Sequence, residues 1–107
     1  MEGKAIRVMI ADDSLIFRET ITALLAKDPD IVVAASAGNG REAFALCQQY
    51  NPDVVLMDIR MPECDGIEGT RLIKNSFPRI KVIIFTTFED REYITEALRY
   101  GAEGYVL

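Results

Sequence analysis

Short apolar runs alternate along the chain with longer segments in which apolar residues recur every three or four positions. The runs are Ala5–Ala11, Ile31–Ala37, Val54–Met57, Val82–Phe85 and Gly104–Leu107. Most of them are continuous rather than alternating, a pattern typical of strands buried on both faces of a parallel sheet. The sequence therefore predicts five such strands.

Four helices are expected between these strands. They cover about Ser14–Lys27, Gly40–Tyr50, Gly66–Ser76 and Asp90–Tyr100. Asp13 and Ser14 favour a helix start, and Gly101 is placed directly after the last helix. Right-handed crossovers turn this alternation into an open sheet with helices on both faces. We expect an α/β fold, a flavodoxin-like doubly wound parallel sheet with the strand order 2-1-3-4-5.

Composition narrows the function classes. The 107 residues include 12 basic and 17 acidic side chains and no histidine, giving a net charge of −5. A domain this acidic is a poor candidate for holding a nucleic-acid backbone by itself. The absence of histidine excludes Ser-His catalysis and most transition-metal sites.

The cellular setting is predicted from the cysteines and the chain start. Cys47 and Cys64 are too few for a disulfide scaffold or a zinc site and are expected to be free thiols, Cys64 in an exposed loop. The stretch after Met1 lacks the features of a signal peptide, and no apolar run approaches the ~20 residues that span a bilayer. We expect a cytoplasmic protein without membrane contact.

Residues that could form a binding or catalytic site follow three of the expected strands. Asp12 and Asp13 come after the first strand, Asp58 after the third, and Thr86 and Thr87 after the fourth. In this fold, ligands bind beyond the carboxyl ends of the strands where the strand order reverses, so the three carboxylates should meet there. Such a cluster repels itself unless a cation neutralises it, and few, hard oxygen ligands suit Mg²⁺.

Each feature also has a structural interpretation. Asp12 and Asp13 could cap the first helix, Asp58 could start a turn, and Thr86 with Thr87 could be ordinary loop residues. Taken together, these structural interpretations are disfavoured relative to a shared site, because all three features follow strands that are expected to be neighbours.

At these residues the sequence resembles the receiver domain of two-component response regulators. The resemblance covers the whole chain and rests on the acidic pair, on Asp58 within VVLMDIRMP, on Asp65-Gly66, on Thr86 and on Tyr105. The stretches DIRMPECDG and GAEGYVL are most similar to the NarL/FixJ-type subfamily, whose members usually carry a helix-turn-helix output domain.

The resemblance implies roles for individual residues. Asp58 would accept a phosphoryl group from a sensor histidine kinase, in a phosphorelay that regulates transcription. Mg²⁺ would be held by Asp12, Asp13, Asp58 and the backbone carbonyl of Arg60. Thr86 would hydrogen-bond the phosphoryl oxygen, and Tyr105 would follow it from exposed to buried as the switch aromatic. Thr87 would line the pocket entrance.

The resemblance also makes the printed sequence look short. Such receivers continue after a Gly-aromatic-apolar-apolar run with a lysine and a fifth helix, whereas here the run Gly104–Leu107 comes last. We expect residues 1–107 to be a C-terminally incomplete receiver domain with the fifth helix missing and no output domain. Any DNA contact would then need a domain absent here. Apolar surface should be exposed beside the first helix, and a bare fifth strand could lead to a homodimer or a segment-exchanged oligomer.

Two other function classes stay open. One is a receiver-like protein-interaction module that works without phosphorylation. The other is a Mg²⁺-dependent phosphohydrolase, which usually needs an Asp-x-Asp pair, whereas the adjacent Asp12 and Asp13 point apart. We expect no enzyme beyond self-phosphoryl transfer and autodephosphorylation.

Overall fold

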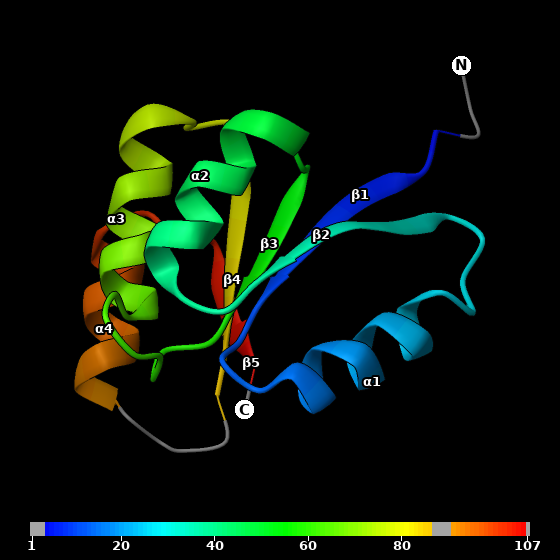
Figure 1. Cartoon of the computed structure of the whole chain (residues 1–107). Helices are drawn as coiled ribbons and strands as arrows, with labels where there is room; N and C mark the ends of the chain where they lie inside the picture. The colour runs from blue at the N-terminus through cyan, green and yellow to red at the C-terminus, as the bar shows by residue number, and fades with distance from the viewer. Residues whose placement is uncertain (1–3, 87–90, 107) are drawn as a thin grey trace.

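The structure, a computed structural model, describes residues 4–86 and 91–106. In this part of the chain, strands and helices alternate from the first element to the last (Figure 1). The elements are β1 (Ile6–Ala11), α1 (Leu15–Leu25), β2 (Ile31–Ala37), α2 (Gly40–Tyr50), β3 (Val54–Met57), α3 (Gly66–Ser76), β4 (Lys81–Phe85), α4 (Arg91–Arg99) and β5 (Gly104–Val106). No helix within the described residues is long and apolar enough to cross a membrane.

Four elements, β2, α2, β3 and α3, have the bounds that the sequence predicts. Helices α2 and α3 begin after strong N-caps, because the side chains of Asn39 and Asp65 accept backbone hydrogen bonds from Glu42 and Glu68. Helix α1 is shorter than expected, because Ser14 is its N-cap rather than its first residue and the helix ends at Leu25.

Further boundaries differ or fall at the margin of the described residues: α4 ends at Arg99, one residue before the expected Tyr100. Strand β1 starts one residue later than expected, at Ile6, and β4 starts one residue earlier, because Lys81 pairs with Val54 of β3. Asp90 and Leu107 lie outside the described residues, so α4 and β5 are compared with the prediction only within them. Gly101 has a φ of +112°, as expected of a residue that ends a helix.

The sheet is parallel and has the strand order β2-β1-β3-β4-β5, which confirms the predicted flavodoxin-like fold. Figure 1 shows α2, α3 and α4 on one face of the sheet and α1 on the other. All strands run in the same direction, so the carboxyl ends of β1, β3 and β4 meet at one edge. This edge holds the candidate chemistry.

The core lies mainly between the sheet and the helices α2, α3 and α4. Met9, Val55, Met57, Val82 and Ile84 contribute fully buried side chains from the central strands, against Ala43, Ile73 and Ala97 from the helices. Helices α2 and α3 approach very closely at Gly40 and Gly69, where a Cβ on Gly69 would lie 2.8 Å from the Cα of Gly40. This crossing fixes the amino end of α2 against α3.

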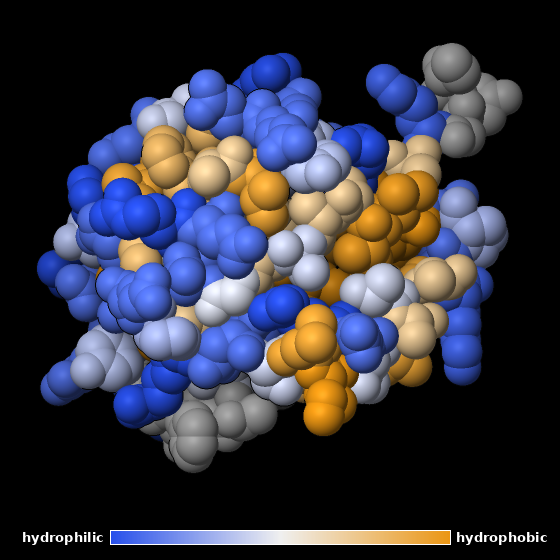
Figure 2. Space-filling view, viewed as in Figure 1, coloured by the Kyte–Doolittle hydropathy of each residue, from blue (hydrophilic) through white to orange (hydrophobic). Residues whose placement is uncertain are grey.

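The opposite face is more open, as expected from the sequence. An apolar groove runs between α1 and the strands, lined by Phe17, Ile21, Leu25, Leu56, Ile83, Phe85, Thr86 and Val106. The rings of Phe17 and Phe85 stack within it at 5.3 Å between centroids. Figure 2 shows further apolar surface at the start of α1, where Leu15 and Ile16 are exposed. The expected apolar surface beside the first helix is therefore present.

Strand β5 is short and is attached to the rest of the fold by Glu103. Its carboxylate accepts hydrogen bonds from the Val82 backbone N–H and from the Lys74 ammonium, both at 2.7 Å. Lys74 also donates to the backbone carbonyls of Pro78 and Ile80. Burial opposes ionisation of Glu103, but these donors together hold its pKa below the usual value. The position of Tyr105, two residues further, depends on this attachment.

The loop between β3 and α3 closes tightly around the backbone of Asp58. The Gly66 N–H donates to the Ile59 carbonyl at 2.8 Å. A Cβ on Gly66 would lie only 1.8 Å from the Asp58 carbonyl oxygen, so a larger residue would require the backbone to move. Gly66 therefore allows α3 to start directly beside Asp58.

Gly66→Ala should lower the free energy of unfolding by about 2–4 kcal/mol, because the new methyl group overlaps backbone atoms that cannot rotate away. Gly104→Ala is the matched control, since a Cβ at Gly104 meets nothing within 4 Å. It should change stability by less than about 0.5 kcal/mol. Urea unfolding followed by circular dichroism measures both, and equal effects of the two substitutions would contradict the described loop.

Candidate functional site

Three carboxylates meet at the carboxyl edge of the sheet. One oxygen from each of Asp12, Asp13 and Asp58 lies within 4.8 Å of the others. The sheet register explains this, because Ala11 at the end of β1 pairs with Met57 at the end of β3. The Asp58 N–H continues the ladder by donating to the Ala11 carbonyl at 2.9 Å. The predicted meeting of the three side chains is therefore confirmed.

The three carboxylates differ in burial. Asp12 is buried at 7% exposure, Asp58 is half-buried, and Asp13 is exposed. One oxygen of Asp12 accepts a hydrogen bond from the Ser14 N–H at 2.7 Å, directly before α1. Asp12 is therefore not the cap of α1, which is Ser14; its carboxylate holds the turn before the helix and lies in the cluster.

Within this cluster, the pKa of Asp58 is clearly raised. Burial raises its pKa first, and the negative charges of Asp12 and Asp13 with a hydrogen bond to the Asp12 side chain raise it further. A hydrogen bond from the Ile59 N–H, at 2.8 Å, acts in the opposite direction. The net result is a pKa of about 7, so Asp58 holds its proton far above the usual range when no cation is bound.

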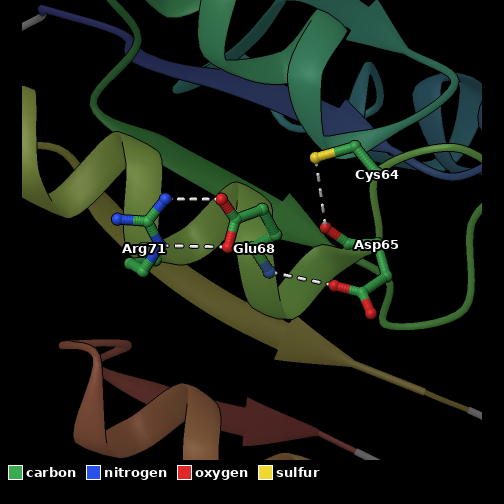
Figure 3. Close-up of polar contacts among 4 residues, drawn as sticks. All are labelled: Cys64, Asp65, Glu68 and Arg71. Atoms are coloured by element: carbon green, nitrogen blue, oxygen red, sulfur yellow. Dashed lines mark hydrogen bonds and ion pairs between the residues drawn. The ribbon is translucent and has the colours of Figure 1, made fainter.

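The segment after Asp58 is held by its own contacts. Figure 3 shows Asp65 capping α3 through the Glu68 N–H, and Glu68 forming an ion pair with Arg71. Cys64 is buried, with 6% exposure, so the expectation of an exposed thiol is wrong. Its sulfur faces the Asp65 carbonyl and the amino end of α2, and burial raises the pKa of the thiol. Both cysteines are free, as expected.

The remaining predicted site residues that the structure describes lie at the same edge or on β5. Thr86 directly follows β4, is buried at 4% exposure, and donates its N–H to the Val106 carbonyl at 3.1 Å. Tyr105 is half exposed on β5. Thr87 lies outside the described residues. Arg60 is exposed, and its guanidinium lies 5.8 Å from the centre of the Tyr93 ring.

A pocket opens beside the carboxylates. Its lining comes from β1's end, from the loop after β3 and from α4: Asp13, Ile59, Arg60, Met61, Pro62, Asp65 and Tyr93. This opening gives a reactant access to Asp13 and to the loop after Asp58, while Asp12 stays buried behind them.

Arg18 is the one residue at this edge that sequence reasoning missed altogether. Its guanidinium, from the second turn of α1, donates a hydrogen bond to the Asp12 carbonyl at 2.7 Å. A lone basic residue on a helix gives no signal of such a contact, because exposed arginines are common on helix surfaces.

The donor set fits a small, hard cation. It consists of carboxylate oxygens, it includes one carboxyl whose pKa is raised by its like-charged neighbours, and it opens to solvent on one side. Mg²⁺ takes oxygen ligands of this kind and keeps several waters. The residues present therefore fit the metal that the sequence suggests.

Because Asp58 has a raised pKa, its contribution to stability should depend on pH in the metal-free protein. The unfolded chain ionises this carboxyl near pH 4, and the folded protein near pH 7. The contribution is therefore fully present below about pH 4 and is lost as the pH rises towards 7. Asp58→Asn should match wild type at pH 4 and exceed its stability by about 1–2 kcal/mol at pH 8, allowing for solvent screening.

Urea unfolding at several pH values in the presence of a chelator measures this difference. Asp30→Asn, at an exposed turn, removes the same charge away from the cluster and should run parallel to wild type over the whole range. A constant offset between Asp58→Asn and wild type from pH 4 to pH 8 would contradict the raised pKa.

Comparison with known proteins identifies the family of this chain. The family model "Response regulator receiver domain" matches residues 8–107. The transcriptional regulatory protein LnrK of Bacillus subtilis (strain 168) is 49% identical over 102 residues, which are 95% of this chain and 46% of LnrK. A protein-glutamate methylesterase/protein-glutamine glutaminase of a Nocardioides species is 44% identical over 103 residues, 94% of this chain and 28% of that protein.

Solved structures give the same result. The crystal structure of a DNA-binding response regulator of the LuxR family from Staphylococcus aureus superposes with a TM-score of 0.88 at 35% identity, over 95% of this chain and 85% of that one. The chain spans about half the length or less of the curated relatives named above. With the family model matching almost the whole chain, this protein belongs to the response regulator receiver domain family, and it is similar to members of the NarL/LuxR type.

Proposed function

We propose that residues 1–107 act as a phosphorylatable receiver in a two-component system. Asp58 accepts a phosphoryl group from a sensor histidine kinase, with Mg²⁺ held by Asp12, Asp13, Asp58 and the Arg60 backbone carbonyl. The change at this edge then controls a DNA-binding output domain in the cytoplasm. The observation that supports this most strongly is the meeting of three carboxylates, one with a pKa of about 7, at an open pocket.

The chemistry needs Asp58 as an ionised nucleophile. A carboxylate oxygen of Asp58 bonds to phosphorus while the phosphorus–nitrogen bond of the donor phosphohistidine breaks. The electron pair of that bond stays on the imidazole nitrogen of the kinase, which takes up a proton. A bound Mg²⁺ neutralises charge on the cluster and on the transferring group.

The same cation makes the nucleophile available at neutral pH. Without it, burial and the neighbouring charges favour the protonated form of Asp58. A dication among the three carboxylates reverses the sign of the local field and favours the ionised form. Binding of the metal and activation of the nucleophile are therefore one electrostatic event.

Thr86 and Tyr105 convert phosphorylation of Asp58 into a conformational change at the protein surface. Thr86, buried directly after β4, offers a hydroxyl to a phosphoryl oxygen, and Thr87 lines the entrance. Tyr105 lies half exposed on the neighbouring strand β5, which agrees with an outward position of the switch aromatic before phosphorylation. A local change of charge thus biases a two-state surface formed by α4 and β5.

The test is labelling with the small phosphodonor acetyl phosphate, followed by intact-protein mass spectrometry. Wild type with Mg²⁺ should gain one phosphoryl group per chain, and a chelator should abolish the gain because the carboxylate cluster then stays uncompensated. Asp58→Asn should gain none, whereas Asp30→Asn, the exposed control, should label like wild type. Thr86→Ala should still label, since its hydroxyl serves the readout.

Three outcomes would overturn the proposal. Labelling of Asp58→Asn equal to wild type would show that the acceptor is another residue. A folded wild type that gains nothing with Mg²⁺ would favour an interaction module that works without phosphorylation. Release of phosphate far above one equivalent per chain would favour a phosphohydrolase.

A further inference from the structure

Arg18 joins three parts of the fold at the acidic edge. Its Nη1 atom lies 2.7 Å from the Asp12 carbonyl oxygen and 3.5 Å from the Ala37 carbonyl oxygen, which ends β2. The Ala37 carbonyl also accepts the Asp12 N–H at 2.9 Å. One guanidinium from α1 therefore reaches the ends of both β1 and β2.

The neighbouring backbone leaves space for this guanidinium. A Cβ on Gly38 would lie 3.3 Å from Arg18 Nη1, so a larger residue there would crowd the nitrogen. The Gly38 N–H is itself bound by the Glu42 carboxylate at 2.7 Å, which holds this turn in place. The Arg18 guanidinium therefore packs closely against the backbone of this turn instead of lying on an open surface.

The contact acts on the peptide unit that joins two of the three acids. The carbonyl of Asp12 belongs to the planar peptide between Asp12 and Asp13, so holding its oxygen limits the rotation of the peptide plane from which both side chains are oriented. The Ser14 N–H fixes the Asp12 carboxylate from the other side at 2.7 Å. Ser14 in turn caps α1 through the Phe17 N–H, so Asp12 is oriented at both its backbone and its side chain by the same helix.

The inward position of the Arg18 guanidinium is unfavourable for the hydrogen bonding of one of its nitrogens. Its Nε atom is buried and has no hydrogen-bond partner among the described residues. Arginines on a helix surface normally extend their charged end into water, where every N–H is hydrated. A side chain that gives this up is held by its remaining contacts, here those of Nη1 with the Asp12 and Ala37 carbonyls.

We propose that Arg18 is a positioning residue of the acidic site, which presets the Asp12–Asp13 peptide so that both carboxylates face a divalent cation. This rests on the proposed function, because it assumes that the cluster binds Mg²⁺. Supporting residues around metal ligands commonly change metal affinity by about 10- to 100-fold when they are removed.

The direction in which Mg²⁺ affinity changes distinguishes a positioning role of Arg18 from an effect of its charge. Arg18 is cationic, so its charge alone repels Mg²⁺, and removing that charge would tighten metal binding. Loss of positioning has the opposite effect, because the two carboxylates then sample orientations that cannot share one ion. A weaker affinity in a variant without the positive charge can therefore come only from lost geometry.

The experiment compares Arg18→Met, Arg18→Lys and Arg7→Met by isothermal titration calorimetry with MgCl₂. Arg7 is the matched control, because its guanidinium also donates to a backbone carbonyl, that of Tyr50, at the other end of β1. Arg18→Met should bind Mg²⁺ about tenfold more weakly than wild type. Arg18→Lys should recover part of the loss, since its ammonium can reach one carbonyl, and Arg7→Met should bind like wild type.

A second readout needs no metal. Hydrogen exchange of the Ser14 amide, measured by NMR in metal-free protein, should be faster in Arg18→Met and unchanged in Arg7→Met, because only the first variant frees the Asp12 peptide. Arg18→Lys keeps the charge and supplies the same comparison if Arg18→Met does not fold.

The outcomes are distinguishable from failure of the proposed function. If wild type binds no Mg²⁺, the metal site itself is wrong. If wild type binds Mg²⁺ and Arg18→Met binds equally well or more tightly, the metal site stands and the positioning role of Arg18 is overturned.

Discussion

Mutual repulsion of three carboxylates is the constraint on which the rest of this structure depends. Asp12, Asp13 and Asp58 would separate if the backbone allowed it, yet oxygens of all three remain within 4.8 Å of one another. The repulsion, together with burial, is visible in the pKa of Asp58, about 7. Strongly perturbed carboxyl groups cluster at functional sites, which supports the proposed capture of a cation and activation of a nucleophile.

The fold prevents the carboxylates from separating by fixing the backbone on every side. Parallel pairing of β1 with β3 places Ala11 opposite Met57, so the next residues of both strands must be neighbours. The start of α1 holds Asp12, and Gly66 lets α3 begin against the backbone of Asp58. The start of α2 also contacts this loop, because the Gly40 N–H donates to the Cys64 carbonyl at 2.7 Å, beside the close approach of α2 and α3 at Gly40 and Gly69.

The sequence predicted the elements whose ends are chemically marked and the acids that follow strands. Strands β2 and β3 and helices α2 and α3 have the predicted bounds because caps and turn residues flank them. Helix α1 was predicted too long, because the chain after Leu25 continues in tighter turns in which Lys27 and Asp28 donate to the Leu24 and Leu25 carbonyls. The burial of Cys64 and the contact of Arg18 could not be predicted, because Cys64 packs against the start of α2 and Arg18 donates to a backbone carbonyl outside its own helix. Hydrophobic periodicity predicts helices and strands but does not predict such contacts.

The central claim is that a divalent cation relieves the repulsion at Asp58. Carbon-13 NMR of the aspartate carboxyl groups, titrated with pH in the presence and absence of Mg²⁺, tests it most directly. We predict that Asp58 titrates near pH 7 without the metal and below its ordinary value of about 4 with it. Titration near pH 4 in both conditions, without any Mg²⁺-dependent shift of the three carboxyl signals, would contradict the account.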